Sequence, residues 1–144
     1  MKLKIKLDPG AYMPERAHST DAGLDLRSIE NVHIFPYCED NQYWTEIETG
    51  VHVQFPPGYY GKIEGRSGLA RKYGLLTFGG VIDSGYTGAI KVLLMNLGDE
   101  PILIKSGDKI AQLIIQRCET PDLEFVSRLD DTERGNNGFG STGW

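Results

Sequence analysis

The chain has 144 residues, 24% of them charged, and a formal net charge of −5, which is the size and composition of one globular domain. The negative charge argues against a nucleic-acid-binding surface, which would need a basic stripe, and no apolar run is long enough to span a membrane. The N-terminus lacks the apolar region of a signal peptide. We therefore expect a cytoplasmic protein with neither nucleic acid nor a membrane as a partner.

Short alternating or apolar segments, separated by turn residues, predict a chain built from β-strands. Residues 1–7 and 51–55 alternate as half-buried strands do. Further strands are predicted at residues 59–64, 90–95, 102–104, 110–116 and 123–126. Residues 89–95 are almost continuously apolar, so we expect them to be buried on both faces. With 18 glycines, 7 prolines and no long helical pattern, the chain is predicted to be all-β, a sandwich or jelly roll with one short helix.

The short helix is predicted directly after Arg66. Ser67 is a suitable N-cap, residues 69–73 follow a helical pattern, and Gly74 can end the helix in the left-handed conformation. The free N–H groups of a helix start, together with Arg66, favour an anion. An ordinary capped helical turn accounts for the same residues without a ligand.

Residues 79–90 are predicted to form a hairpin with a carboxylate at its tip. Two apolar residues lead into the turn signal Asp83-Ser84-Gly85, and Tyr86 begins the next run. Asp83 is either a catalytic group or a common turn residue, and Tyr86 is either a ligand contact or a half-buried strand aromatic.

The end of the chain has the composition of a mobile arm, so we divide the chain into a β-domain, residues 1–127, and an arm, residues 128–144. Arg134 offers a planar charged fork, and the glycines and hydroxyl residues that follow it offer phosphate donors. Phe139 is a flat apolar face with no local cover. The arm therefore suits a nucleotide clamp, although a disordered tail or an expression remnant has the same composition.

The metal and redox residues are sparse. Cys38 and Cys118 have no metal-ligand spacing and are predicted to be free thiols. The three histidines, at positions 18, 33 and 52, show no ligand pattern. Any metal ion must therefore be held by a substrate or by carboxylates.

Five segments of the chain together resemble one family, the trimeric dUTP pyrophosphatases, or dUTPases. They occur in the family's order and extend over nearly the whole chain. The segments are Ala22-Gly23-Leu24-Asp25-Leu26, Gly65-Arg66-Ser67-Gly68-Leu69-Ala70, residues 80–88, residues 107–114, and Arg134-Gly135 with Gly138-Phe139-Gly140-Ser141-Thr142-Gly143. The resemblance implies a distorted jelly roll that assembles as a homotrimer with shared active sites.

The resemblance also implies the reaction. dUTPases hydrolyse dUTP to dUMP and pyrophosphate with Mg²⁺, by in-line attack of water on the α-phosphorus, which limits uracil in DNA and supplies dUMP for dTMP synthesis. Asp83 matches the general base, and Tyr86 matches the ring that packs on deoxyribose and rejects UTP. The backbone around Gly80, Ile82 and Ile90 is expected to bind the uracil edge.

The remaining motifs imply the phosphate and metal contacts. Arg66, Ser67, Gly68 and Gln112 match phosphate-binding positions, and Asp25 matches a carboxylate that reaches Mg²⁺ through water. Five residues of the arm match the segment in which the phenylalanine stacks on uracil and the others clamp the γ-phosphate. These are Arg134, Phe139, Gly140, Ser141 and Thr142.

The chain departs from the family pattern at three places. Thr87 stands where an arginine is usual, Gly85 stands where an acidic residue is common, and residues 36–44 are longer than usual. Two rival functions stay open: a dCTP deaminase, or a bifunctional deaminase and hydrolase, of the same fold, and a dUTP-binding regulatory protein that acts through a partner.

Overall fold

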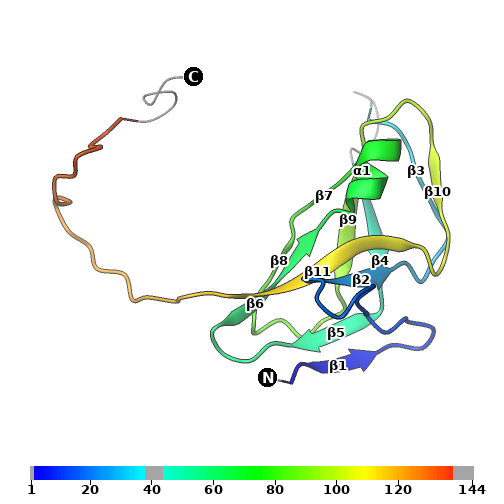
Figure 1. The fold of residues 1–144 in the computed structure, drawn as a ribbon, viewed down its shortest axis with the longest axis horizontal. Helices are drawn as coiled ribbons and strands as arrows, with labels where there is room; N and C mark the ends of the chain where they lie inside the picture. The colour runs from blue at the N-terminus through cyan, green and yellow to red at the C-terminus, as the bar shows by residue number, and fades with distance from the viewer. Residues whose placement is uncertain (1, 38–43, 138–144) are drawn as a thin grey trace.

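The computed structural model describes residues 2–37 and 44–137, and Figure 1 shows a body of β-strands from which the C-terminal segment leads away. The predicted all-β class is confirmed, since short strands and a single helix make up the regular structure of the described residues. The strands are β1 (Lys4–Leu7), β2 (Gly23–Arg27), β3 (Val32–Ile34), β4 (Thr45–Glu48), β5 (Val51–Gln54), β6 (Tyr59–Glu64), β7 (Leu75–Phe78), β8 (Val81–Ile82), β9 (Lys91–Asn96), β10 (Ile102–Ile104) and β11 (Lys109–Arg117).

The strands pair antiparallel in small sheets that enclose one core, as in a jelly roll (Figure 1). The sheet orders are β2-β11-β6-β8, β4-β9-β7, β1-β5 and β3-β10. The long strand β11 lies between β2 and β6 and has a register shift between Lys109 and Ala111. This central position matters because β11 carries residues of the fourth motif.

The core consists of the inward-facing side chains of alternating strand positions. Leu26, Ile110 and Leu113 are fully buried between the sheets. In β9, Val92 and Leu94 are buried, whereas Lys91 is exposed. The prediction that residues 89–95 are buried on both faces is therefore wrong, because the β4-β9-β7 sheet has one open face.

The helix α1 (Ser67–Tyr73) is present, and Gly74 ends it with a left-handed φ of 69° as predicted. The predicted N-cap is wrong. Arg66, still extended from β6, occupies the capping position with φ of −91° and ψ of 124°, and no side chain caps the helix. Ser67 is already the first helical residue.

The predicted hairpin at residues 79–90 is also wrong. β8 pairs with β6 in one sheet, while β9 pairs with β4 and β7 in another. Gly80 makes this possible, because a side chain there would collide with the carbonyl oxygen of Ile63, whose N–H donates to the Gly80 carbonyl at 2.7 Å. Residues 83–90 are consequently a loop that crosses from one sheet to the other, which we call the crossing loop.

After β11 the described chain contains neither helix nor strand. Leu123 and Phe125 are 96% and 98% exposed. The strand predicted at residues 123–126 is therefore wrong for the single chain, because no other strand lies beside it. The boundary after residue 127 stays a prediction.

Two smaller predictions concern thiols and membranes. Cys118 is a free thiol as predicted, whereas Cys38 lies outside the described residues. No described helix is long and apolar enough to cross a membrane.

Candidate active site

Two polar residues of the motifs and a neighbouring glutamate meet where β2, β11 and β6 pair. Gln112 of β11 lies directly opposite Asp25 of β2 on one side and Glu64 of β6 on the other. Directly opposed residues of antiparallel strands project to the same face. The register therefore gathers two carboxylates and an amide on one face, next to the start of α1.

Asp25 is buried, with 4% of its surface exposed, and two cations hold it. Nζ of Lys109 lies 2.6 Å from Oδ2, and Nε of Arg66 lies 3.4 Å from Oδ1. The Arg66 contact is close enough for an ion pair but not for a well-formed hydrogen bond, so Oδ1 is left without a hydrogen-bond partner among the described residues. A buried charge requires such pairing, which makes this cluster a fixed element of the site.

The same contacts orient Arg66. Its Nη1 donates to the carbonyl oxygen of Lys109 at 3.2 Å, and its Nε faces Asp25. A guanidinium has five N–H donors, so several stay available to a ligand. They border a cavity of about 300 Å³ at the start of α1, which we call the helix pocket. Its lining is Arg66, Ser67, Gly68, Leu69, Lys72, Tyr73 and Gln112.

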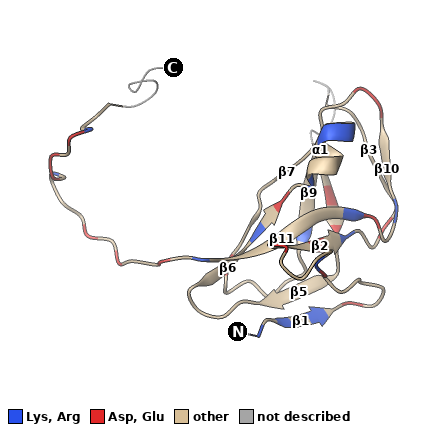
Figure 2. Cartoon of the chain, viewed as in Figure 1, with Lys and Arg blue, Asp and Glu red and all other residues tan. Residues whose placement is uncertain are grey.

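The helix pocket is positively charged. Figure 2 shows Lys and Arg at α1, where Lys72 adds its charge to that of Arg66. The sequence-predicted phosphate residues Arg66, Ser67, Gly68 and Gln112 are therefore brought together in one basic cavity.

A second cavity, of about 260 Å³, lies between the crossing loop and the β4-β9-β7 sheet, and we call it the loop pocket. Its lining is Gly79, Val81, Ile82, Asp83, Tyr86, Glu46, Lys91 and Leu93. Lys91 bridges Glu46 at 2.6 Å and Glu48 at 2.9 Å, and these carboxylates, Glu46 first, raise the pKa of Lys91. Lys91 is therefore a cation in the wall of the loop pocket.

The crossing loop is closed by its own hydrogen bonds. The Tyr86 N–H donates to the Asp83 carbonyl at 3.0 Å, and the Tyr86 hydroxyl donates to the Ala89 carbonyl at 2.9 Å. The Tyr86 ring packs against Gly88, where any side chain would meet it. Asp83 and Tyr86, the predicted base and deoxyribose contact, therefore stand on one compact turn with exposed side chains.

One predicted substrate contact, Ile90, lies in the core. Ile90 is 1% exposed, its N–H donates to the Val51 carbonyl at 2.8 Å, and its own carbonyl accepts from the Thr49 hydroxyl at 2.6 Å. These contacts anchor the end of the crossing loop, and the uracil contact expected of Ile90 stays a prediction.

The two pockets have no lining residue in common. The described part of the arm joins neither of them, and Arg134 donates from Nε to the Asn137 carbonyl at 2.9 Å. Phe139, Gly140, Ser141 and Thr142 lie outside the described residues. Within one chain, the helix pocket and the loop pocket are therefore separate cavities.

The part of the chain that the structure describes offers no dedicated metal cage. Among the described residues, no three His, Cys, Asp or Glu side chains gather closely enough to hold an ion. Within residues 2–37 and 44–137, the one buried side-chain polar atom without a hydrogen-bond partner is Oδ1 of Asp25, which a water molecule can satisfy. That arrangement fits Mg²⁺, which keeps several waters and binds mainly to substrate phosphates.

Comparison with known proteins places the chain in a family. A sequence model described as dUTPase matches residues 10–143. The deoxyuridine 5'-triphosphate nucleotidohydrolase of Clostridium kluyveri is 48% identical over 146 residues, which cover 99% of each protein. The chain belongs to the dUTPase family.

Solved dUTPases have the same fold. A variant of the dUTPase of Staphylococcus bacteriophage 80alpha, bound to dUpNHpp, superposes with a TM-score of 0.87 at 34% identity and covers 99% of each chain. A variant of the dUTPase from phage phi11 of S. aureus, described with a structural Mg(II) ion, superposes with a TM-score of 0.82 at 32% identity. The match covers 91% of this chain and 100% of that chain.

Within this dUTPase, two positive residues of the site carry no sequence signal. Lys109 follows Asp108 in the fourth motif, but only the pairing of β11 with β2 places its ammonium on Asp25. Lys72 lies in α1 like any exposed helix lysine, and only the pocket shows its position.

Proposed function

We propose that the protein hydrolyses dUTP to dUMP and pyrophosphate. The observation that carries the proposal is the placement of Asp83 and Tyr86 on one compact turn at the loop pocket. A nucleoside fits a cavity lined by a flat ring and backbone groups, and a carboxylate beside it can act on a water molecule.

In this proposal Asp83 accepts a proton from water as the water attacks the α-phosphorus in line, and pyrophosphate leaves. Tyr86 packs against the deoxyribose, and its ring leaves no space for a 2′-hydroxyl. Backbone groups near Gly80 and Ile82 bind uracil. The Gly80 carbonyl is already bonded to Ile63, so its N–H group is the available one.

The helix pocket binds the phosphates through Arg66, Ser67, Gly68 and Gln112. Asp25 and the Lys109 carbonyl hold the guanidinium of Arg66 in place, so its free N–H donors are aimed before substrate binds. Phosphoryl transfer depends mainly on positioning and on neutralising charge. Lys72 and Lys109 add to that charge.

We further propose Mg²⁺ as the cofactor, with the Asp25 carboxylate meeting it through a water molecule. The metal would neutralise charge on the phosphates. The residues of the two pockets orient the substrate, and Asp83 accepts the proton.

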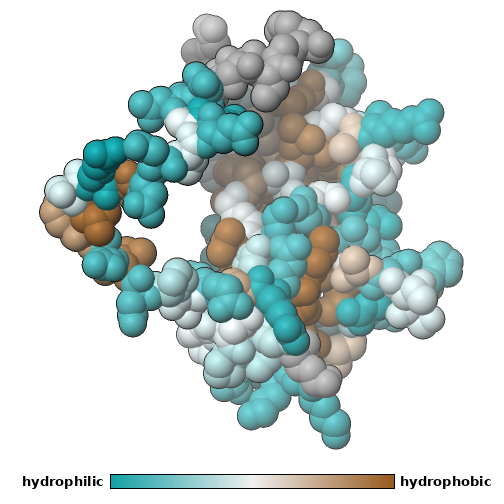
Figure 3. Space-filling view, turned by 60° about the vertical axis from the view of Figure 1, so that its left-hand side comes forward, coloured by the Kyte–Doolittle hydropathy of each residue, from teal (hydrophilic) through white to brown (hydrophobic). Residues whose placement is uncertain are grey.

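The homotrimer is also part of the proposal. Because the helix pocket and the loop pocket are separate, contact between subunits is one way to bring them together on one nucleotide. Several large apolar side chains are exposed on β7 and on the C-terminal segment. Figure 3 shows hydrophobic residues at the surface of the C-terminal segment. They include Leu76, Phe78, Leu123 and Phe125. Exposed apolar groups of this number indicate an interface.

The arm completes the proposed site. Arg134, Gly140, Ser141 and Thr142 clamp the γ-phosphate, and Phe139 stacks on uracil. The activity limits uracil incorporation into DNA and supplies dUMP for dTMP synthesis.

The test is an assay of pyrophosphate release from dUTP, dCTP, dTTP and UTP, with and without Mg²⁺. We expect release from dUTP with Mg²⁺, far faster than from the other three. Equal rates with UTP would contradict the role of Tyr86, and ammonia release from dCTP would instead identify a deaminase. Tight dUTP binding without turnover would indicate a regulatory protein.

A further inference from the structure

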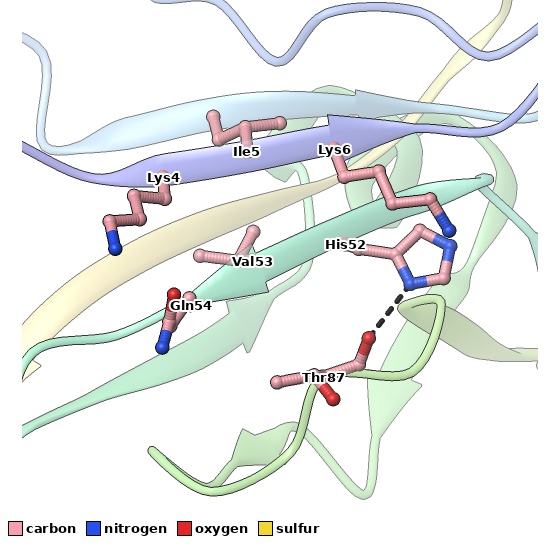
Figure 4. A pocket seen from close by; sticks show the side chains of 7 residues that line it. All are labelled: Lys4, Ile5, Lys6, His52, Val53, Gln54 and Thr87. Atoms are coloured by element: carbon pink, nitrogen blue, oxygen red, sulfur yellow. Dashed lines mark hydrogen bonds between the residues drawn. The ribbon is translucent and has the colours of Figure 1, made fainter.

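A histidine outside the motifs holds the crossing loop. His52 lies on β5, opposite Lys6 of β1, and is half-buried with 17% of its side chain exposed. Its Nδ1 donates to the Thr87 carbonyl at 2.8 Å, the contact drawn in Figure 4. Its Nε2 donates to Oδ2 of Asp8 at 3.0 Å. His52 thus joins the end of β1 to the residue next to Tyr86.

This contact is the main attachment of the loop tip. The hydrogen bonds that we find for residues 83–89, within the described chain, are two bonds internal to the loop and the one from His52. The next fixed point along the chain is the buried Ile90. The position of Tyr86 therefore depends on the bond between His52 and Thr87.

The two hydrogen-bond partners of His52, the Thr87 carbonyl and the Asp8 carboxylate, also determine its protonation state. A carbonyl oxygen and an ionised carboxylate only accept hydrogen bonds, so both bonds form together only when both ring nitrogens carry hydrogen. The bond to Thr87 and then the bond to Asp8 raise the pKa of His52 above its ordinary value of 6.5. The bond to His52 lowers the pKa of Asp8, which keeps that carboxylate ionised.

The other charges around His52 are few. From β1, Lys6 opposes a proton on His52 and pairs with Oδ1 of Asp8 at 3.6 Å. Lys4, also on β1, lines the pocket that His52 and Thr87 border (Figure 4). From the loop, the facing group is the neutral Thr87. The hydrogen bonds to the Thr87 carbonyl and to Asp8 together therefore favour the imidazolium.

We propose that His52 is a positioning residue for sugar selection: as an imidazolium it fixes the crossing loop so that the Tyr86 ring excludes a 2′-hydroxyl, and it releases the loop when it loses its proton. The proposal rests on the dUTP hydrolysis argued above. It also explains how a chain with Thr87 in place of the family's usual arginine keeps a positive charge at this loop.

The direction in which pH changes selection against UTP follows from the protonation of His52. Below the ordinary value of 6.5 both bonds are present, and as pH rises through the higher pKa of His52 in the folded protein, one of them is lost. A neutral imidazole donates only one hydrogen bond, and the ionised carboxylate of Asp8 is a stronger acceptor than the Thr87 carbonyl, so the hydrogen stays on Nε2 and the bond from Nδ1 to Thr87 is lost. Selection against UTP should therefore weaken at alkaline pH.

The first experiment compares kcat/KM for dUTP and for UTP between about pH 6 and about pH 9, a range that spans histidine titration. The measured quantity is kcat/KM for dUTP divided by kcat/KM for UTP. The titration of Asp83 cancels in this ratio, because both substrates use the same base. Wild-type protein should show a ratio that falls with pH. His52→Gln should show a ratio about fivefold lower near pH 6, the scale of one hydrogen bond, with little pH dependence.

Two further variants sharpen the result. Asp8→Asn removes the charge that stabilises the imidazolium, so the fall in the ratio should move to lower pH. His33→Gln makes the same substitution at an exposed histidine whose ring has no hydrogen bond to another described residue, and should behave as wild type. Identical ratios for wild type and His52→Gln across the pH range would overturn the proposal.

A second measurement does not depend on activity. Amide hydrogen exchange by NMR, expressed as protection factors to remove the intrinsic pH effect, should show that protection at Tyr86–Gly88 falls as pH rises in wild type and is low throughout in His52→Gln. Unchanged protection with intact dUTP hydrolysis would refute the role of His52 alone. Absence of dUTP hydrolysis would refute the proposed function, while the exchange data would still test the link.

Discussion

The ammonium of Lys109 lies 2.6 Å from Oδ2 of Asp25, a carboxylate with only 4% of its surface exposed. The first motif and the fourth motif therefore meet as a buried ion pair, with Arg66 of the second motif on the other oxygen. The cluster links three motif segments that are far apart in the sequence, and it holds in place the Arg66 guanidinium that we propose binds phosphate.

Removing Lys109 should destabilise the fold. Breaking a buried ion pair costs ~3–5 kcal/mol. Because Arg66 remains beside Asp25 and Lys109 is partly exposed, we expect Lys109→Met to lower the free energy of unfolding by about 2 kcal/mol. Urea unfolding followed by fluorescence measures the change.

The control for that variant is Lys105→Met, at an exposed lysine four residues earlier, which should change stability by less than about 0.5 kcal/mol. Equal effects of the two substitutions would show that the Asp25–Lys109 pair does not stabilise the fold.

Asp83→Asn should lower kcat for dUTP by at least ~10²-fold, because the amide keeps the shape but cannot accept the proton. Binding of dUpNHpp, measured by calorimetry, should persist. Asp99→Asn, at another exposed turn residue, is the matched control and should be fully active. Near-normal turnover by Asp83→Asn would mean that Asp83 serves only the turn.

The stability of the protein should depend on pH through His52 and Asp8. The raised pKa of His52 gives stabilisation that is present below 6.5 and lost as pH rises through the folded-state pKa. The lowered pKa of Asp8 gives stabilisation that is present above 3.8 and lost as pH falls through its folded-state pKa. The melting temperature of His52→Gln should therefore fall furthest below wild type between these values and approach it at alkaline pH. A constant difference at all pH values would contradict the assignment of charge.

Deleting residues 134–144 should leave the fold intact, because the described part of this segment is exposed and the buried core lies in residues 24–113. Activity should fall steeply, since the nucleotide loses its cover. Circular dichroism and the pyrophosphate assay separate the two effects. Normal hydrolysis by the truncated protein would mean that the arm plays no part.

The sequence predicts what local patterns determine. The alternation of residues 51–55, the strand 59–64 and the glycine that ends α1 are properties of adjacent residues, and all three are confirmed within one or two residues. The motif resemblance also locates the phosphate residues, which the structure gathers in the helix pocket.

Long-range pairing could not be predicted in the same way. Asp83-Ser84-Gly85 carries a strong turn signal, yet the strands that flank it join different sheets, so the expected hairpin does not form. The contact of Lys109 with Asp25 requires the β2-β11 register, and the link from His52 to Thr87 requires the close approach of two distant segments. Residues 123–126 have a strand pattern but no neighbouring strand in the chain.

Mixing two inactive variants tests most directly whether subunits share one dUTP-hydrolysing site. One variant is Asp83→Asn with its arm, and the other lacks residues 134–144 but retains Asp83. If they assemble at random in equal amounts as closed trimers, about three quarters of trimers are mixed, and one site in three pairs an intact loop with an intact arm. We predict about a quarter of wild-type dUTP hydrolysis. Activity near zero, with mixed trimers confirmed by mass spectrometry, would contradict a site built from more than one chain.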